Sequence, residues 1–539
     1  MGSPLNDAEV LALRRTRLFG AAGTVLMAIG ALGVGARPVV QDPTFGVRLL
    51  NLPSRIQTVS LTMTTTGAVM MALAWLMLGR FALGDRRMSR SQLDRLLWLW
   101  VLPLLIAPPM YSRDVYSYLA QSEIAGRGLD PYKVGPAPGL GLDHVFTLSV
   151  PNMWRETPAP YGPLFLWIGE GISALTGENI VAAVLCHRLV VLLGVGLIVW
   201  AVPRLARRCG VAEVSAMWLG AANPLLLMHL VAGIHNEALM LGLMLAGTEF
   251  ALRGVDARDP LLPRPLTWPR GADGWARWYP MTMLLVGVAL ITMSSQVKLP
   301  SLLALGFVAM ALACRWGGTV KAFLLAGGSL GAVSVAVMGL IGWASGLGFG
   351  WLFTLGTANV VRSWMSLPTL LALGTGQVGI LLGLGDHTTA ILGLTRAMGV
   401  SIIAVLVSWL LLLVLRGRLH PVGGLGVALG VTVLLFPVVQ PWYVLWAVLP
   451  LAAWATRPAF RTTTIIVTLA VGIFGPTANG DRFTLFQILL AVAASTVIAL
   501  ALIALTYNRL PWRATIAPAD SPPAPAPQPA RPDAYAESP

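Results

Sequence analysis

The chain has 539 residues, of which 56% are hydrophobic and only 11% are charged, and its mean hydropathy is +0.74. In soluble proteins about a quarter of all residues are charged, so this composition excludes a soluble globular protein. Apolar runs of roughly 17–25 residues recur along the chain, and this is the length that a helix needs to cross a bilayer. The alternating pattern of a membrane β-barrel is not seen in these runs. The sequence therefore predicts an all-α polytopic membrane protein.

The formal net charge is +14, but the basic residues do not indicate a nucleic-acid partner. Arginines dominate them and fall in short segments between apolar runs, which is the orienting signal of a protein embedded in anionic lipid. We therefore expect membrane lipids, and no nucleic acid, as partners. Three cysteines, Cys186, Cys209 and Cys314, are too far apart to indicate a disulfide framework or a metal site.

The arginine-rich loops orient the expected spans. Residues 1–17 form a cytoplasmic N-terminal segment, 18–507 a transmembrane domain of about 13–15 helices, and 508–539 a disordered Pro/Ala-rich tail. The spans are expected in chain order near residues 18–36, 57–79, 96–109, 180–203, 213–233, 238–252, 281–297, 301–314, 322–343 and 392–415, with four more before Tyr507.

Residues 110–178 form the first large outer loop in this topology. Its apolar part, 163–176, is short and holds Glu170, which favours a helix lying on the membrane surface. Counting it as a span would also place the arginines near residue 207 outside. A second short apolar stretch, 368–385, is either another surface helix or a further span.

The unusual polar clusters of the sequence fall on the predicted outer side. Charges at membrane depth are costly and usually line a cavity or a pathway, so clusters at several span ends indicate one shared site. The clusters are Arg113-Asp114, His235-Asn236-Glu237, Lys298, Arg362-Ser363-Trp364, Gln440-Pro441-Trp442-Tyr443 and Asp481-Arg482.

Asp114 is the candidate for acid–base chemistry. It follows an apolar stretch directly, in the sequence YSRDVYSYLAQ. Three roles are open to it: an ion pair with Arg113 or a nearby loop, an N-cap for the helix that follows, or a general base at the lip of a partly dry cavity.

The tripeptide His235-Asn236-Glu237 lies between two expected spans. It is either a polar turn at the interface or a recognition element for hydroxyl or phosphate groups, with Glu237 as a second candidate base. A metal shared by Asp114 and Glu237 would need further ligands, so we expect no metal site from these residues.

Cations and aromatic side chains complete the set. Lys298 and Arg362 either extend to the membrane interface or bind a phosphate group. Trp364, Trp442 and Tyr443 belong either to an interfacial aromatic belt or to a site where rings stack on a sugar or flank an isoprenoid chain. A carboxylate, cations, aromatic rings and apolar walls together predict glycosyl transfer from a lipid-phosphate sugar.

The chain resembles the polyprenol-phosphomannose-dependent α-1,6-mannopyranosyltransferases of mycobacteria and corynebacteria, in the GT-C class. The resemblance rests on YSRDVYSYLAQ, GLDPY, PAPYGPLF, GIHNEALM, VKLP, VVRSWMSLPT and VQPWYVLW, in this order between residues 110 and 446. One departure is Glu237, where an HND-like motif leads us to expect Asp.

The resemblance implies a GT-C-like bundle with outer surface helices in the plasma membrane and an inverting mannosyl transfer on the outer or periplasmic side. The donor would be decaprenyl-phosphate-mannose, and the acceptor a phosphatidylinositol-mannoside or a growing lipomannan or lipoarabinomannan backbone. A divalent metal is possible in this class but not required. Asp114 would be the base, and Lys298, Arg362 and Arg113 would hold the donor phosphate. The expected sugar and acceptor residues are Tyr116, Tyr118, Tyr132, Tyr161, His235, Asn236, Glu237, Ser363, Trp364, Gln440, Trp442 and Tyr443.

Two other functions share parts of this pattern. A transporter or flippase of a lipid-linked sugar also has many spans, but usually shows internal repeats and polar residues at the midplane. A GT-C transferase of different sugar specificity is the other alternative.

Overall fold

The computed structural model describes residues 3–257, 274–354, 356, 362–363, 365–474 and 483–512. In this part of the chain the only strands are a two-residue pair, β1 (Ser3–Pro4) with β2 (Arg86–Arg87). Eight described helices are long and apolar enough to cross a membrane, and five shorter apolar helices accompany them. The predicted all-α, multi-pass membrane fold is confirmed, whereas the number of shorter helices that cross the bilayer stays a prediction.

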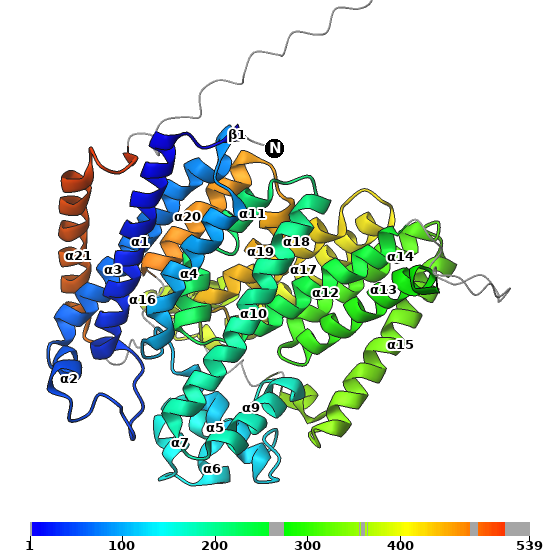
Figure 1. Ribbon diagram of the computed structural model, residues 1–539. Helices are drawn as coiled ribbons and strands as arrows, with labels where there is room; N and C mark the ends of the chain where they lie inside the picture. The colour runs from blue at the N-terminus through cyan, green and yellow to red at the C-terminus, as the bar shows by residue number, and fades with distance from the viewer. Residues whose placement is uncertain are drawn as a thin grey trace, which may run out of the picture.

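The helices at the start of the chain form one flank of the bundle, where α3 packs against α1 and the late helix α21 (Figure 1). Several begin earlier or end later than the apolar runs suggest, because charged residues extend the helix beyond the apolar part. The helices of this flank are α1 (Asp7–Val34), α2 (Arg48–Arg55), α3 (Gln57–Leu83), α4 (Arg90–Ile106) and α21 (Leu485–Thr506).

The 110–178 segment forms a compact group of short helices at one end of the bundle, at the bottom of Figure 1. Its longest members, α5 and α9, pack against each other. The bounds of α9 coincide with the helix that the sequence predicts at 163–176. The helices are α5 (Asp114–Gly126), α6 (Pro136–Leu140), α7 (Val145–Ser149), α8 (Asn152–Arg155) and α9 (Pro163–Thr176).

The span expected at 213–233 is not one continuous helix. It consists of α11 (Glu213–Leu219) and a π-helix, η1 (Leu226–Ala232). Pro224 stands in the interruption and lacks the backbone N–H that a continuous helix requires. Asn223 stabilises the break, since its side-chain oxygen accepts a hydrogen bond from the Leu225 backbone at 2.9 Å. The segment therefore reaches its polar end through an irregular turn, an arrangement frequent near functional sites.

The middle of the chain supplies the centre of the bundle. Here α10 packs against α12, and α12 packs against α13 (Figure 1). The central elements are α10 (Ile180–Arg208), α12 (Glu237–Asp256), α13 (Gly274–Ser295), η2 (Leu299–Leu302), α14 (Leu303–Arg315) and α15 (Val320–Ala344).

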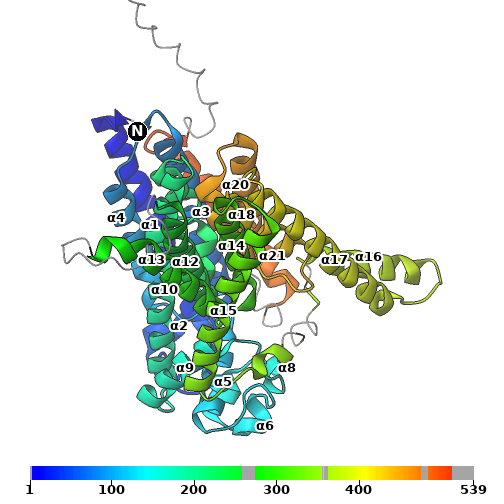
Figure 2. The same ribbon diagram turned by 90° about the vertical axis from the view of Figure 1, so that its right-hand side faces the viewer.

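The last third of the chain adds a projecting pair of helices, α16 and α17, which extends sideways from the bundle in Figure 2. Because α16 has only 15 residues, the choice between a surface helix and a span for 368–385 stays open. The elements are η3 (Gly350–Thr354), α16 (Leu367–Leu381), α17 (Thr388–Leu415), α18 (Pro421–Leu435), η5 (Pro441–Tyr443), α19 (Val444–Trp454) and α20 (Pro458–Phe474).

Glycines allow α10 and α12 to approach closely. A Cβ atom on Gly194 would lie 2.3 Å from the backbone of Ala238, and one on Gly242 would lie 2.4 Å from the carbonyl oxygen of Gly194. Small residues at such crossings let membrane helices pack backbone to backbone. This crossing fixes the first turn of α12, where Glu237 lies.

We predict that Gly194→Ala destabilises the protein by about 1–3 kcal/mol, because the added methyl group meets rigid backbone. The matched control is Gly196→Ala, two residues further along α10, where an added Cβ has nothing within 4 Å. Alanine favours the helix there, so this control should be neutral or stabilising. Thermal unfolding of both variants in the same detergent tests the prediction. Equal melting temperatures would contradict the close packing of α10 and α12.

Candidate active site

Asp114 is the first residue of α5, and the loop before it is held in an unusual backbone conformation. The backbone of Met110 donates a hydrogen bond to the Ala232 carbonyl at 2.9 Å, which ties this loop to the end of η1. Tyr111 has a φ angle of 64°, in the left-handed region that non-glycine residues seldom adopt. The backbone N–H of Asp114 then donates to the Ser112 hydroxyl at 3.0 Å. These contacts fix where α5 begins and where the carboxylate lies.

The carboxylate of Asp114 does not pair with its neighbour Arg113. The Arg113 guanidinium donates instead to the Ser149 carbonyl, at 3.1 and 3.0 Å, and lies over the Tyr116 ring. Asp114 is not the N-cap either, because Arg113 holds that position without a side-chain cap. The carboxylate is 28% exposed and lies 3.7 Å from Nε2 of His235. The pair with Arg113 and the N-cap role are therefore wrong, whereas a contact with a nearby loop, here through His235, and the role of a general base stay open.

His235 is completely buried and held on two sides. Its ring stacks on Trp442, with the ring centroids 3.6 Å apart, and its Nδ1 lies 2.7 Å from the His229 carbonyl oxygen. The preceding residue, Ile234, has a φ angle of 57°, which is rare and strained for a β-branched residue. Backbone strain of this kind is typical of residues whose position serves a function.

The tautomer of His235 follows from its partners. Burial lowers the pKa of His235, although the charges of Asp114 and Glu237 oppose this shift, so the imidazole is neutral near pH 7. A carbonyl oxygen can only accept, so Nδ1 carries the proton that His229 accepts. The bare Nε2 therefore faces the Asp114 carboxylate, and the two acceptors are suited to share a hydroxyl proton.

Glu237 and Lys298 form a buried ion pair beside this histidine. The Lys298 ammonium donates to the Glu237 carboxylate and, at 3.1 Å, to the Tyr443 hydroxyl. The side chain of Glu237 is 1% exposed and that of Lys298 is 20% exposed. Burial disfavours the charge of Lys298, but Glu237 and Tyr443 outweigh it and hold the pKa of Lys298 above its ordinary value. Lys298 thus stays protonated, and it bonds to protein groups rather than extending to the membrane interface.

Aromatic rings surround the ion pair. Lys298 lies 4.6 Å from the centroid of the Tyr443 ring and 5.9 Å from that of Trp446. Tyr443 and Trp446 stack with their centroids 4.3 Å apart. Tyr118 and Tyr161 meet edge to face on another side of the site. Burial, together with the charges of Asp114 and Glu237, holds the pKa of both hydroxyl groups above its ordinary value.

Several buried polar atoms of this region have no hydrogen-bond partner among the described residues. Buried polar groups are normally satisfied, so a concentration of unpaired donors and acceptors suits a ligand with many hydroxyl groups. These atoms belong to Tyr111, His229, His235, Asn236, Glu237, Gln296, Trp442 and Trp446. We call them, together with Asp114, Lys298, Tyr118, Tyr161 and Tyr443, the acid–lysine cluster.

Other predicted site residues have different neighbours. Tyr116 donates its hydroxyl proton to the Ala36 carbonyl, and the Tyr132 ring packs against Gly350. The Ser363 hydroxyl donates to the Val439 carbonyl. The Gln440 carbonyl accepts from the Tyr443 backbone, which closes the turn before α19.

Arg362 is exposed, and its electrostatic partners are Asp386 and Arg396 on the projecting pair of helices. None of its described interactions joins the acid–lysine cluster. Its role at the donor phosphate, like that of Arg113, stays a prediction. Trp364, Asp481 and Arg482 lie outside the described residues.

Sequence reasoning missed four members of the cluster: Tyr111, His229, Gln296 and Trp446. His229 and Gln296 stand within or at the end of apolar runs, and a polar residue at such depth is itself a signal of function. The described residues contain no group of three or more His, Cys, Asp or Glu side chains that could hold a metal ion.

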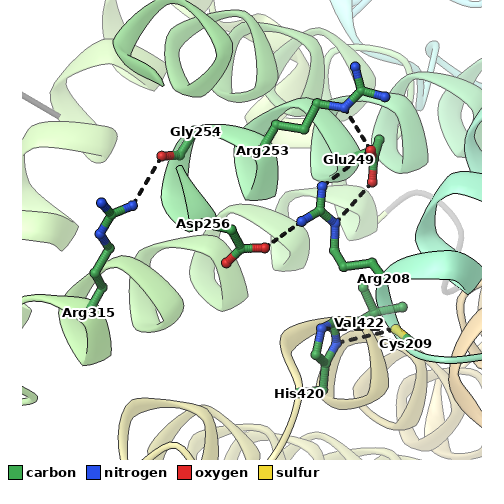
Figure 3. Close-up of polar contacts among 9 residues, drawn as sticks. All are labelled: Arg208, Cys209, Glu249, Arg253, Gly254, Asp256, Arg315, His420 and Val422. Carbon is green, nitrogen blue, oxygen red and sulfur yellow. Dashed lines mark hydrogen bonds and ion pairs between the residues drawn. The ribbon is translucent and has the colours of Figure 1, made fainter. Parts of the chain in front are cut away.

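A second polar cluster lies at the carboxyl-terminal ends of α10 and α12, away from the acid–lysine cluster (Figure 3). Its charges are paired differently. Arg208 binds Glu249 at 3.2 Å and also pairs with Asp256, while Arg253 binds Glu249 at 2.7 Å. Each of these carboxylates is matched by an arginine. This cluster therefore joins α10 to α12, and it offers no carboxylate comparable to Asp114.

Comparison with known proteins places this arrangement in a family. Residues 17–314 match the model described as the N-terminal domain of alpha-(1->6)-mannopyranosyltransferase, and residues 368–504 match the MptB C-terminal domain. The chain belongs to the alpha-(1->6)-mannopyranosyltransferase family. Asp114, His235, Glu237 and Lys298 all lie within the matched N-terminal part.

Individual relatives agree with this membership. A probable alpha-(1->6)-mannopyranosyltransferase of Mycolicibacterium smegmatis is 82% identical over 100% of this chain and 96% of its own length. An alpha-(1->6)-mannopyranosyltransferase of Mycobacterium tuberculosis is 72% identical, with the same coverage. Alpha-(1->6)-mannopyranosyltransferase B of Corynebacterium glutamicum is 40% identical over 88% of this chain and 78% of its own. No solved structure matches the chain significantly.

We predict that Glu237 and Lys298 are strongly coupled. Glu237→Gln and Lys298→Met should each lower the melting temperature, because each leaves the partner's charge buried and unpaired. The double variant should lose less than the two single losses combined, with a coupling energy of about 1–3 kcal/mol. Thermal unfolding of the wild type, the two single variants and the double variant measures this coupling energy. Additive losses would show that the two side chains act independently.

Proposed function

We propose that this protein transfers mannose from a polyprenyl-phosphate-mannose donor to the 6-hydroxyl group of an α-1,6-mannan acceptor, with Asp114 as the base. The reaction takes place at the outer face of the plasma membrane and extends a lipomannan or lipoarabinomannan backbone. The observation that carries the proposal is the position of Asp114: a partly exposed carboxylate that faces the buried imidazole of His235, in a cluster that also holds the Lys298 ammonium and unpaired polar groups.

The chemistry follows from these positions. The acceptor hydroxyl donates its proton toward Asp114, with Nε2 of His235 as a second acceptor 3.7 Å away. The acceptor oxygen attacks the anomeric carbon while the bond from that carbon to the phosphate oxygen breaks. The electron pair leaves with polyprenyl phosphate, and the proton stays on Asp114. A β-linked donor gives an α-linked product, so one base suffices.

Lys298 is suited to stabilise the departing phosphate. An ammonium group has three donors, and the described contacts to Glu237 and Tyr443 use two of them. The third can bind a phosphate oxygen, and a cation placed where negative charge develops lowers the barrier. Glu237 then acts as the group that positions Lys298 rather than as a second base.

The outer location is supported by the distribution of charge. Arg204, Arg207 and Arg208 lie in the last turns of α10, whereas the first residues of this helix lie on the side of α5 and α9 (Figure 1). Arginines mark the cytoplasmic side of membrane proteins, so the end with Asp114 faces outward. A lipid-linked donor suits a reaction at that membrane surface.

We predict that Asp114→Asn lowers kcat by about 10²–10⁴-fold, the usual contribution of a general base. Asp130→Asn is the matched control, because Asp130 lies in the same segment but pairs with Lys133 at 3.0 Å. The assay supplies radiolabelled polyprenyl-phosphate-mannose and a short α-1,6-mannoside to protein in nanodiscs. Near-normal turnover by Asp114→Asn would exclude Asp114 as the general base. Movement of donor across the bilayer without a glycosidic product would favour a flippase.

The lowered pKa of His235 predicts an acid limit to activity. Because the pKa of His235 is lowered, its imidazole stays neutral until the pH falls below about 6.5, the ordinary pKa of a histidine. Protonated His235 would then donate to Asp114 and weaken its ability to accept a proton, so kcat/KM should fall at acid pH. His235→Asn should shift the pH at which kcat/KM falls, whereas His144→Asn, in the α6–α7 region, should leave that pH unchanged. An unchanged profile in both variants would exclude a titrating role for His235.

A further inference from the structure

A cavity lies at the carboxyl-terminal ends of α12 and α14, at the other end of α12 from Glu237. Its volume is about 670 Å³, within the usual range of about 300–1,000 Å³ for ligand sites. The end of α17 and the turn that leads into α18 also line it. In the proposed orientation of the protein, this end of the bundle faces the cytoplasm.

The cavity has an apolar wall and a basic rim. Arg315 and Arg418 are exposed and lie at the ends of their helices, where they form the rim. Leu252 lies in the wall, four residues or about one helical turn before Asp256. Ala311 lies in the wall at the same spacing before Arg315. The wall is thus deeper in the bundle than the rim, and a fitting ligand carries hydrocarbon as well as negative charge.

The carboxylates at this end are already neutralised. Asp256 lines the cavity, but its carboxylate pairs with Arg208 (Figure 3). Glu249 is bound by Arg208 at 3.2 Å and by Arg253 at 2.7 Å. Arg418 forms no ion pair with a carboxylate in the described part of the chain. The cavity therefore keeps a positive charge that an anionic ligand can match.

Arg315 and His420 add hydrogen-bond donors to the cavity. The Arg315 guanidinium donates to the Gly254 carbonyl at 3.4 Å, which holds it beside the end of α12 (Figure 3). Nδ1 of His420 accepts from the Val422 backbone at 3.3 Å, so in the neutral ring the proton is on Nε2. Guanidinium and imidazole N–H groups are suitable donors to phosphate oxygens.

The neighbours of the cavity place it at the membrane surface. Trp316 follows Arg315 and is 41% exposed. Leu412 on α17 is 47% exposed and lies two residues before Val414, which lines the cavity. Tryptophan is enriched at the level of the lipid head groups, and an exposed leucine in a span faces acyl chains. The cavity therefore lies where head groups meet hydrocarbon.

We propose that this cavity binds an anionic phospholipid of the cytoplasmic leaflet. The phosphate lies against Arg315, Arg418 and His420, and the first part of an acyl chain lies against the apolar wall. Basic pockets between membrane helices on the cytoplasmic side are typical sites for such head groups. A soluble phosphate ester shares the charge but cannot use the wall. The site is distinct from the acid–lysine cluster and does not depend on the transfer reaction.

Photolabelling of the wild-type protein in nanodiscs is the first test, and it needs no variant. Phosphatidylglycerol with a diazirine near its head group should label α14 and residues 414–421 more strongly than α21, which is also exposed to lipid. Excess phosphatidylglycerol should reduce this labelling, and the same excess of phosphatidylcholine should not. Equal labelling of α21, or equal competition by phosphatidylcholine, would overturn the proposal.

Removal of one rim charge is the second test. Arg418→Gln should weaken the binding of phosphatidylglycerol in detergent about fivefold, the usual contribution of one arginine near anionic lipid. Arg416→Gln is the matched control, because Arg416 is also exposed at the end of α17 but does not line the cavity. This control should bind the lipid as the wild type does. Equal losses in the two variants would indicate a general attraction to the basic surface and would reject the site.

A soluble competitor distinguishes the two sources of phosphate. Glycerol 1-phosphate, at the concentration of phosphatidylglycerol that abolishes labelling, should leave the labelling unchanged. Displacement of the lipid by this ester would assign the cavity to a soluble phosphate and reject the phospholipid.

The cavity and the transferase can fail separately, because none of these measurements uses mannosyl transfer. Specific labelling of a protein that makes no mannoside would uphold the cavity and reject the transferase. Normal transfer with unspecific labelling would uphold the transferase and reject the cavity.

Discussion

The arrangement of the candidate active site depends on one largely buried ion pair, between Lys298 and Glu237. The two residues are 61 positions apart and lie at the ends of different helices. Tyr443, from a third segment, completes the contact through its hydroxyl. A charge buried in this way is tolerated only when it is paired and hydrogen-bonded, so the pair requires the three segments to meet in one arrangement. The rings around this pair belong to His235, Trp442 and Trp446.

The surrounding backbone is irregular in the places where side chains of the site are presented. A π-helix precedes His235, and Ile234 and Tyr111 both have positive φ angles. The hydrogen bond from Met110 to Ala232 joins the two loops that contain these residues. Regular helices on either side keep the loops in these conformations, which an isolated chain would seldom adopt. Rigid packing such as the Gly194–Gly242 crossing thus supports precise placement of Asp114 and His235.

The two ends of the central helices have different tasks. At one end, arginines match every carboxylate of the Glu249–Asp256 cluster, and this network holds α10 and α12 together. At the other end, polar groups outnumber their partners, and Asp114 remains partly exposed. A substrate with many hydroxyl groups suits this second end, because it can supply partners to the unpaired polar groups.

The sequence by itself determined the membrane class, the bounds of α9 and the family, because these depend on composition, local periodicity and short motifs. It also marked His235, Glu237 and Lys298, since polar residues beside apolar runs are conspicuous. Only the tertiary structure decided their partners: Glu237 with Lys298, Asp114 with His235, and Arg113 with the Ser149 carbonyl. It alone added His229 and Gln296 to the site and divided the 213–233 segment. Such pairings join residues far apart in the chain, so they are set by how the helices pack and not by any local pattern.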